Sequence, residues 1–517
     1  MESALHQHKG SFFNRNRVFS GLLLTAIVLY TALTFFYSPD PRGSDQYWNI
    51  GNVDRVVHQD GKFRTNNIFP AGLPETLKDL PRPWVQNRPV VYLVTGLAFL
   101  VSDPHLAWVL MNCFFMLACL AMLYRIMKQD ESPHRGWMLA SLVMFLFIPL
   151  NFYLGMQGLP EVFNEMLTLV IAVILISPAN VLIRALLAGL VTGILLYQRD
   201  NYLLLFVLIT LFFFRFESGG KRFSAAGVFL LVASACYLMK PYLFPGHTIK
   251  PIPVLSLVAE VRRGNSNMVN YLFPDLPAQD LGNLVRILFE KSWRALTMQF
   301  TPGGEDAVFR YPVNLLMLPV VVLLTRFRSL SPRRKQLVFI TTGFIVLHFL
   351  TIMVFENQYR FSSILIPLLL LCFYYFTGLF TGKQAKFSTY GTAILIGLFL
   401  VADLVIGNIN KREAKADKTF ISQVRAYKNI IGDETVMAPY YGGRSLIIGY
   451  SISPNYCYYF AGHMDKDKLW NDAEKLGASL VIYRNNIRFA KEIRDRIIEE
   501  YPIGNDHTLA RIRTTEN

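Results

Sequence analysis

A carboxylate stands close behind the first apolar run of the chain, in the stretch GSDQYWNIGNVDRVVHQDG at residues 43–61. Asn49 and Asn52 follow Asp45 at i+4 and i+7, so a helix here would place the three polar side chains on one face. A carboxylate where a chain leaves a membrane can serve as a general base. The alternative is that Ser44 or Asp45 only caps the helix. The opposite face is apolar and suits a membrane surface; it is formed by Trp48, Val53, Val56 and Val57.

Two further carboxylates lie one turn apart in NFYLGMQGLPEVFNEM, at the predicted start of a helix. Glu161 is the first, and its alternative role is to complement the helix dipole. Glu165 lies deeper in the apolar run, where a carboxylate is costly unless it faces a cavity or a partner. We expect both side chains to face a substrate cavity.

Two short turns between apolar runs combine an arginine with an acid. They are YQRDNY, with Arg199 and Asp200, and ENQYRF, with Glu356 and Arg360. Each arginine alone could extend its head group to lipid phosphates. Beside carboxylates, the two favour a bound phosphate or diphosphate.

Other chemistries lack their motifs. There is no Walker loop, no GxSxG and no HExxH, and the lone histidines His58, His247, His348 and His463 show no metal-ligand spacing, so we predict no protein metal site. The five cysteines form neither a disulfide framework nor a CxxC motif. A divalent cation is compatible with the sequence but not required by it.

The elements that must position these residues are membrane helices. Of the 517 residues, 53% are hydrophobic and 17% charged, and the apolar residues come in runs near the length that crosses a bilayer. The net charge of +15 lies mainly in short loops, which indicates the lipid bilayer and not a nucleic acid as partner. We predict an α-helical polytopic membrane protein with about eleven spans, near 18–37, 105–127, 137–154, 161–177, 181–197, 201–215, 223–243, 312–327, 336–355, 361–381 and 388–407.

The loop charges predict the orientation. With residues 1–17 in the cytoplasm, every inner loop carries lysine or arginine, and the short outer loops hold only Arg199 and Arg360. This order requires residues 88–101 to form a juxtamembrane or re-entrant helix and not a span. The transmembrane domain then covers residues 18–407, with long outer loops at 38–104 and 244–311.

The tail, residues 408–517, alternates helical and extended signals. KTFISQVRAYKNII and DKDKLWNDAEKLG have helical spacing, and ETVMAP and ASLVIYR are typical of short strands. We predict a small C-terminal α/β domain outside the cytoplasm.

The order of these features resembles the GT-C glycosyltransferases, which include protein O-mannosyltransferases and lipid A aminoarabinose transferases. The stretch SDQYWNIGNVDRVVHQDG stands where such enzymes often have Asp-Glu-x-x-Tyr, although Gln46 replaces the second acid. NRPVVYLVTGLAFLVSDPHLAWVLMNCFFMLACLAMLYRI is similar to their pattern of a basic residue, proline and a long helix ending in Tyr and Arg. YQRDNYLLLFVLITLFFF and ENQYRFSSILIPLLLL resemble their arginine-headed helices.

The resemblance implies an inverting hexosyl- or pentosyltransferase that uses a polyprenyl-phosphate-linked sugar. The acceptor would be a lipid, a glycan or a protein. Asp45 would be the general base, and Arg199 and Arg360, with Arg88 as a third candidate, would stabilise the leaving phosphate. Glu161 and Glu165 would orient the acceptor or hold a divalent ion together with Asp45. The resemblance places the enzyme in a bacterial inner membrane, in cell-envelope polysaccharide synthesis, with its site on the periplasmic or extracellular face.

Two other functions fit the same layout. A flippase or transporter of lipid-linked oligosaccharide also needs a cavity between helices and phosphate-binding arginines, but its coupling charges belong near the bilayer midplane. A polysaccharide polymerase or ligase would differ mainly in its donor.

Overall fold

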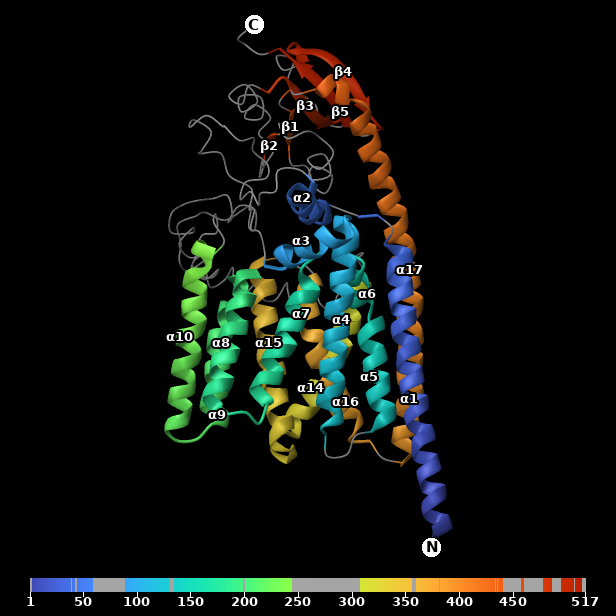
Figure 1. The fold of residues 1–517 in the computed structure, drawn as a ribbon, viewed down its shortest axis with the longest axis vertical. Helices are drawn as coiled ribbons and strands as arrows, with labels where there is room; N and C mark the ends of the chain where they lie inside the picture. Colours follow the sequence, from blue (N-terminus) through green and yellow to red (C-terminus); the bar gives the residue numbers. More distant parts are fainter. Residues whose placement is uncertain are drawn as a thin grey trace.

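The computed structural model describes residues 2–38, 40–41, 44–58, 89–130, 134–198, 200–243, 307–355, 359–380, 382–432, 434, 436–439, 457–459, 478–485, 494–505 and 507–513. The N-terminal half (Figure 1) forms α1 (Glu2–Tyr37), α2 (Ser44–His58), α3 (Pro89–Val101), α4 (Pro104–Lys128), α5 (Arg135–Phe147), α6 (Pro149–Gly155), α7 (Glu161–Ile176), α8 (Val181–Gln198), the 3-10 helix η2 (Asp200–Leu204), α9 (Leu205–Phe216) and α10 (Gly220–Leu243). The C-terminal half forms α14 (Ala307–Thr325), η3 (Phe327–Ser329), α15 (Pro332–Phe355), η4 (Tyr359–Leu365), α16 (Ile366–Thr377), α17 (Gly382–Ala426), α18 (Lys428–Ile431), β1 (Val436–Pro439), β2 (Cys457–Tyr459), β3 (Leu480–Arg484), β4 (Ile497–Ile503) and β5 (His507–Ile512).

Each of the predicted apolar runs forms a helix or two consecutive helices of one bundle (Figure 1). Within the described residues, six helices are long and apolar enough to cross a membrane, or seven if α5 and α6, which meet at a bend of 51°, count as one. The remaining runs give shorter or less apolar helices. Residues 89–101 form the separate short helix α3, which Figure 1 shows across the end of the bundle. The protein is therefore a polytopic helical membrane protein.

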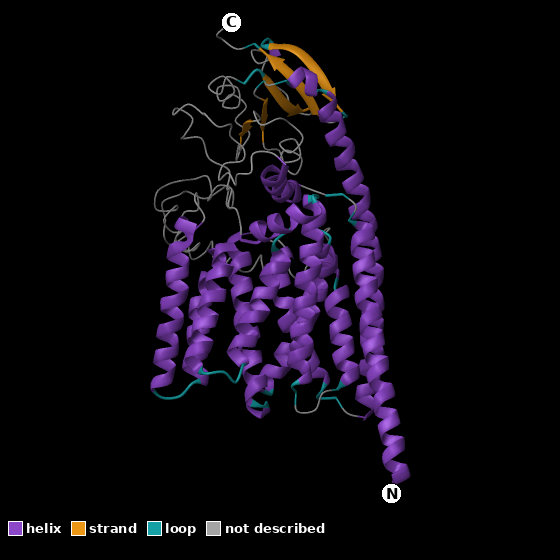
Figure 2. Ribbon diagram, in the orientation of Figure 1, coloured by secondary structure: helices purple, strands orange, loops and turns teal. Residues whose placement is uncertain are grey.

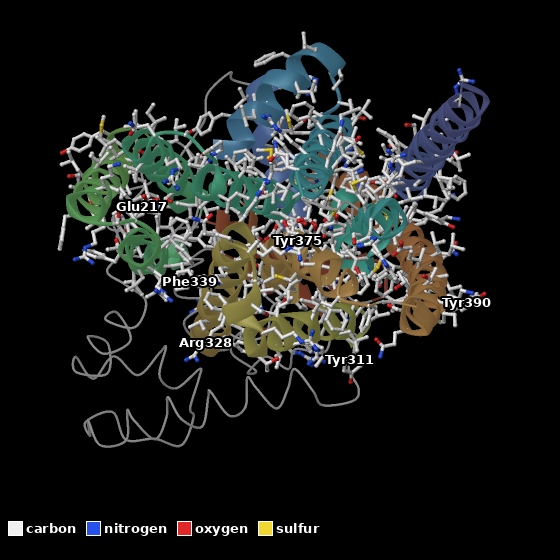
Figure 3. The ribbon with its side chains drawn as sticks, turned by 90° about the horizontal axis from the view of Figure 1, so that it is seen from below. Glu217, Tyr311, Arg328, Phe339, Tyr375 and Tyr390 are labelled. Carbon is white, nitrogen blue, oxygen red and sulfur yellow. The ribbon has the colours of Figure 1, made fainter. Side chains whose placement is uncertain are left out.

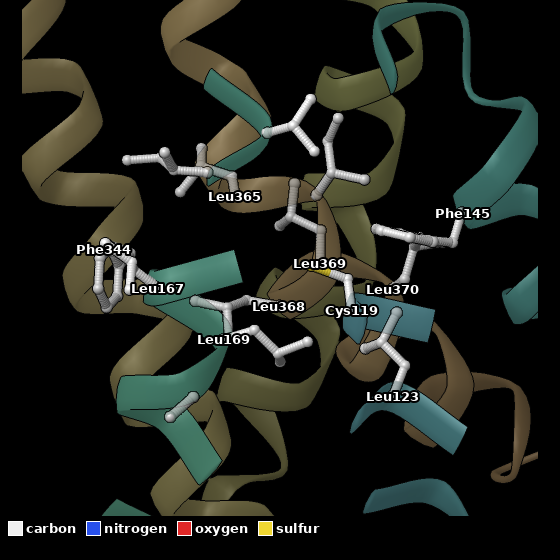
Figure 4. Close-up of a cluster of buried hydrophobic side chains, with 14 of the residues drawn as sticks. Cys119, Leu123, Phe145, Leu167, Leu169, Phe344, Leu365, Leu368, Leu369 and Leu370 are labelled. Atoms are coloured by element: carbon white, nitrogen blue, oxygen red, sulfur yellow. The ribbon is translucent and has the colours of Figure 1, made fainter. Parts of the chain in front are cut away.

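Apolar side chains of α4, α5, α7, α15 and α16 fill the middle of the bundle (Figure 4). Small residues allow close packing elsewhere, because helices in lipid associate through tight van der Waals contact. Gly189 and Gly193 form a Gly-xxx-Gly pair on α8 against α10. A Cβ atom at Gly193 would lie only 2.4 Å from the Cβ of Cys236, so any larger residue there would force α8 and α10 apart.

One end of the bundle, seen from below in Figure 3, holds the loops that follow α4, α7, α9 and α14, and we call it the basic end. Arg334 pairs with Asp130 at 2.8 Å, and Arg184 pairs with Glu217 at 2.5 Å. Each pair joins two loops that the charge pattern assigned to the same side of the membrane. The opposite end carries α2, α3, η2, η4 and the start of α7, and we call it the site end.

The C-terminal strands form a mixed sheet in the order β2-β1-β3-β5-β4 (Figure 2). β1 is parallel to β2 and β3, whereas β5 is antiparallel to β3 and β4. This confirms strands at ETVMAP and ASLVIYR; the predicted helix DKDKLWNDAEKLG lies outside the described residues.

Helix α17 connects this sheet to the bundle without a break. It has 45 residues, about 68 Å at the usual helical rise, so the predicted boundary between residues 407 and 408 falls inside one helix. At the far end Phe420 and His507 meet edge to face with 5.1 Å between ring centroids, and Tyr427 donates to the carbonyl of Pro502 at 2.8 Å. The sheet is thus carried by a single long helix that begins at the basic end.

Candidate active site

The structure places the predicted site residues on four elements. Asp45 lies in the first turn of α2, Glu161 and Glu165 lie on α7, Asp200 begins η2, and Arg360 lies on η4. The side chains of Asp45, Asp200 and Arg360 are outside the described part of the chain, as are Arg88, Arg199 and Glu356 altogether. All four elements belong to the site end.

Helix α2 is attached to the segment that leads into α7. The side-chain nitrogen of Asn49, one turn after Asp45, donates to the carbonyl of Gly158 at 2.8 Å. The valine face of α2 is buried, with Val53 0% and Val56 6% exposed, and α2 contacts α3 and α4. Val53 and Val56 thus pack on neighbouring helices and not on the membrane surface that we expected for them; the side chain of Trp48 lies outside the described part of the chain. The helix of Asp45 therefore has a fixed place beside the start of α7.

A polar stripe runs along one face of α7. Glu161, Asn164, Glu165 and Thr168 recur at helical spacing, and all are at most 2% exposed. Glu165 accepts a hydrogen bond from the amide of Asn151 on α6 at 3.2 Å. Its second oxygen, with the side-chain oxygens of Asn164 and Thr168, has no hydrogen-bond partner among the described residues. Glu161 still suits the dipole of α7, but buried carboxyl and amide groups deeper in an apolar helix indicate a site.

The 3-10 helix η4, which carries Arg360, packs directly against α7, the helix of the polar stripe. η4 contacts α7, α6 and α14. Arg310, in the first turns of α14, is only 6% exposed, and the neighbouring Phe309 stacks on Tyr153 of α6 at 5.0 Å. A buried arginine thus lies on a helix that touches both α6 and η4. From the sequence we placed Arg310 in the outer loop at residues 244–311. Its position just before an apolar run is the signal that could have identified it.

Other buried polar groups also lie outside our predictions. Lys240, near the end of α10, is 0% exposed and donates to the carbonyl of Leu196 at 3.3 Å. Gln198, the last residue of α8 before η2, is 1% exposed, and neither atom of its amide has a partner in the described structure. Asp403 on α17 is 0% exposed, with both oxygens likewise unpaired there. Lys240 and Asp403 could have been identified from the sequence, because each is a single charged residue within an apolar run.

The arrangement can bind an anion and move a proton. Cationic and acidic elements meet at one end of the bundle, where the low dielectric strengthens their interaction with a charged substrate. In the described ranges, no three His, Cys, Asp or Glu side chains cluster closely enough to hold a metal ion.

Comparison with solved structures identifies the architecture. The archaeal oligosaccharyltransferase of Archaeoglobus fulgidus, crystallised with a tethered acceptor peptide containing the NVT sequon, matches with a TM-score of 0.58 and 12% identity, over 89% of this chain and 69% of its own. ArnT from Cupriavidus metallidurans, bound to undecaprenyl phosphate, matches with a TM-score of 0.58 and 8% identity, over 95% of this chain and 98% of its own. Both are GT-C glycosyltransferases. The chain has a GT-C fold.

The apo form of the same ArnT also matches this GT-C fold, with a TM-score of 0.53 and 9% identity. No family model matches the chain, and no curated protein matches its sequence. The architecture is therefore shared while the residues differ, so the role of each side chain must be argued from its own position.

Proposed function

We propose that the protein is a membrane glycosyltransferase that transfers a sugar from a polyprenyl-phosphate carrier to a lipid, glycan or protein acceptor. The observation that supports this most is that a GT-C fold gathers the helix of Asp45, the carboxylate stripe of α7 and the arginine-bearing η4 at one end of the bundle. Two solved structures with this fold contain the lipid carrier without its sugar, as undecaprenyl phosphate in ArnT, and an acceptor peptide, in the oligosaccharyltransferase.

The proposed reaction is a single displacement. The acceptor hydroxyl attacks the anomeric carbon of a hexose or pentose, and the bond from that carbon to the phosphate oxygen breaks. Attack opposite the leaving group inverts the anomeric configuration. Asp45 takes the hydroxyl proton, and Arg199 and Arg360, with Arg88 as a third candidate, stabilise the negative charge on the departing polyprenyl phosphate. Glu161 and Glu165 orient the acceptor.

The charge distribution supports an orientation as well. Basic loops favour the cytoplasmic side, so the site end would face the periplasm or the cell exterior in a bacterial inner membrane. The lipid carrier would enter between helices from the bilayer, and no nucleotide sugar is needed at that face.

The direct test is transfer by the purified protein in lipid. Lipids that co-purify are identified by mass spectrometry, and polyprenyl-phosphate hexoses and pentoses are then offered with labelled acceptors. We expect labelled product only with a polyprenyl-phosphate donor. Transfer from nucleotide sugars, with none from any polyprenyl-phosphate sugar, would refute the proposed donor class.

The second candidate is a flippase for lipid-linked sugars, and the buried Asp403 is the residue on which it can be tested. Buried acids inside spanning helices are typical of coupled transporters. Asp403 lies four residues before Gly407, where the predicted span ends, which is about 6 Å along the helix and nearer the boundary than the midplane. Movement of a fluorescent polyprenyl-phosphate sugar between leaflets, without chemical transfer and abolished by Asp403→Asn, would establish the transporter instead.

A further inference from the structure

The short segment between α6 and α7 is held by side chains from three other elements. Three of its backbone carbonyls, those of Met156, Gln157 and Gly158, accept side-chain hydrogen bonds, as does the carbonyl of Leu154 at the end of α6. The donors are Asn112 on α4, to Leu154 at 3.1 Å and Gln157 at 2.6 Å; Ser38 after α1, to Met156 at 2.8 Å; and Asn49 on α2, to Gly158 at 2.8 Å. The bonds to Met156, Gln157 and Gly158 satisfy carbonyls that lie outside the helices, whereas the carbonyl of Leu154 also accepts from the backbone nitrogen of Gln157 at 3.1 Å. The segment that sets where α7 begins is thereby fixed from several sides.

The side chain of Gln157 adds a link to α17. Its amide nitrogen donates to Asn410 Oδ1 at 2.8 Å, and the amide nitrogen of Asn410 donates to the carbonyl of Tyr37 at 2.8 Å. Gln157 is 2% exposed and Asn410 is 1% exposed. One buried chain of amides therefore joins the end of α1, helix α17 and the segment before Glu161.

Nearby contacts show that α17 is seated at this level. The ring of Tyr37 lies against Gly407, where an added Cβ would be 2.5 Å from the ring. Above it, Lys411 lies 4.0 Å from the centroid of Phe36, and Lys418 pairs with Asp40 at 2.9 Å. The hydrogen-bonded amide pair adds a directional contact that accepts only one register of α17 against the segment before α7.

We propose that Gln157 and Asn410 are positioning residues, which fix the start of α7 and its Glu161 to the helix that carries the outer sheet. This role rests on the proposed function, in which Glu161 orients the acceptor. Because α17 is continuous from the bundle to the sheet, a displacement of the sheet along that axis reaches Glu161 through this amide pair. The separation of 253 residues in sequence makes the link a product of the fold alone.

The test compares Gln157→Met and Asn410→Leu with Asn408→Leu as a matched control. Asn408 lies two residues away on α17, is exposed, and donates only within its own helix, to Leu404. Hydrogen–deuterium exchange is measured on the purified full chain in lipid. We expect protection of residues 156–165 to fall about tenfold in Gln157→Met and in Asn410→Leu, and no change in the control. The double variant should fall no further than Asn410→Leu, because both single variants remove the bond between Gln157 and Asn410 and Asn410→Leu also removes the bond to Tyr37.

Kinetics supply the functional readout. Both variants should raise the KM for the acceptor or lower kcat while the KM for the donor stays unchanged. Unchanged protection in the two single variants, additive losses in the double variant, or equal loosening throughout the bundle would each overturn the proposal. The exchange result does not depend on sugar transfer. A chain that transfers no sugar but loses protection at residues 156–165 would therefore reject the proposed function and retain the link.

Discussion

At the basic end of the bundle, Arg334 and Asp130 pair at 2.8 Å while their side chains remain 24% and 10% exposed. At the site end, Glu165 is 0% exposed and accepts one hydrogen bond from an amide. The Arg334–Asp130 pair lies partly in water, where an ion pair costs little and adds little. Polar groups at the site end are buried in helices, where an unpaired group is expensive. The second arrangement is hard to explain by solubility or orientation, and it agrees with the site that we propose at this end.

The prediction with the largest expected effect concerns the side of the membrane that each end faces. A reporter active only outside the cytoplasm should be active when fused after residue 517 and silent within residues 328–335. The C-terminal position is preferable to a fusion near residue 410, because Asn410 is buried in the middle of α17. A silent C-terminal fusion of a stable protein would reverse the orientation and move the site end into the cytoplasm.

Asp45→Asn should give the largest effect on chemistry. Asparagine keeps the size of the side chain and suits a helix start, but it cannot take a proton, so transfer should fall about a hundredfold or more with folding intact. Asp54→Asn is the matched control on α2, since Asp54 contacts His58 at 3.0 Å. The rate of labelled product formation is measured for both. Full activity in a folded Asp45→Asn protein would return Asp45 to a capping role; partial recovery in Asp45→Glu with added divalent ion would indicate a metal.

Arginine removal at the site end should have an intermediate effect. Arg360→Ala and Arg199→Ala should each weaken use of the donor by about 1.5–3 kcal/mol, because a charge-assisted contact to phosphate is lost. Arg328→Ala, exposed at the basic end, is the control and should leave the KM for the donor unchanged. If the KM for the donor is the same in all three variants, Arg360 and Arg199 only extend to lipid head groups.

The smallest effect should come from the basic end. Arg334→Ala should lower the free energy of unfolding by about 1 kcal/mol or less, and added salt should reduce the difference. Sugar transfer should not change. Thermal unfolding at two salt concentrations measures the change in stability. If Arg334→Ala loses sugar transfer at unchanged stability, the basic end also takes part in function and the comparison of the two ends fails.

Much of this architecture could be predicted because its signals are local. The apolar runs, the basic loops and the short helix at residues 89–101 follow from stretches of some twenty residues, since a bilayer imposes length and composition on each helix separately. Asp45, Glu161, Glu165, Asp200 and Arg360 could be named because each is an exception to those local rules. Gln157 and Asn410 could not, because neither amide is unusual for its own helix, and their importance lies only in their contact.

The sequence by itself determined that the chain lies in a membrane, which segments form its apolar helices, and which loops carry positive charge. These depend on the hydrophobic effect and on charge, both of which act along the chain. Only the tertiary structure decided that α2 packs on α3, that α17 runs unbroken to the sheet, and that Asn49, Gln157 and Asn410 meet around one segment. In lipid every helix offers a similar apolar surface, so the choice of neighbours falls to side-chain shape and to a few buried hydrogen bonds between residues far apart in sequence.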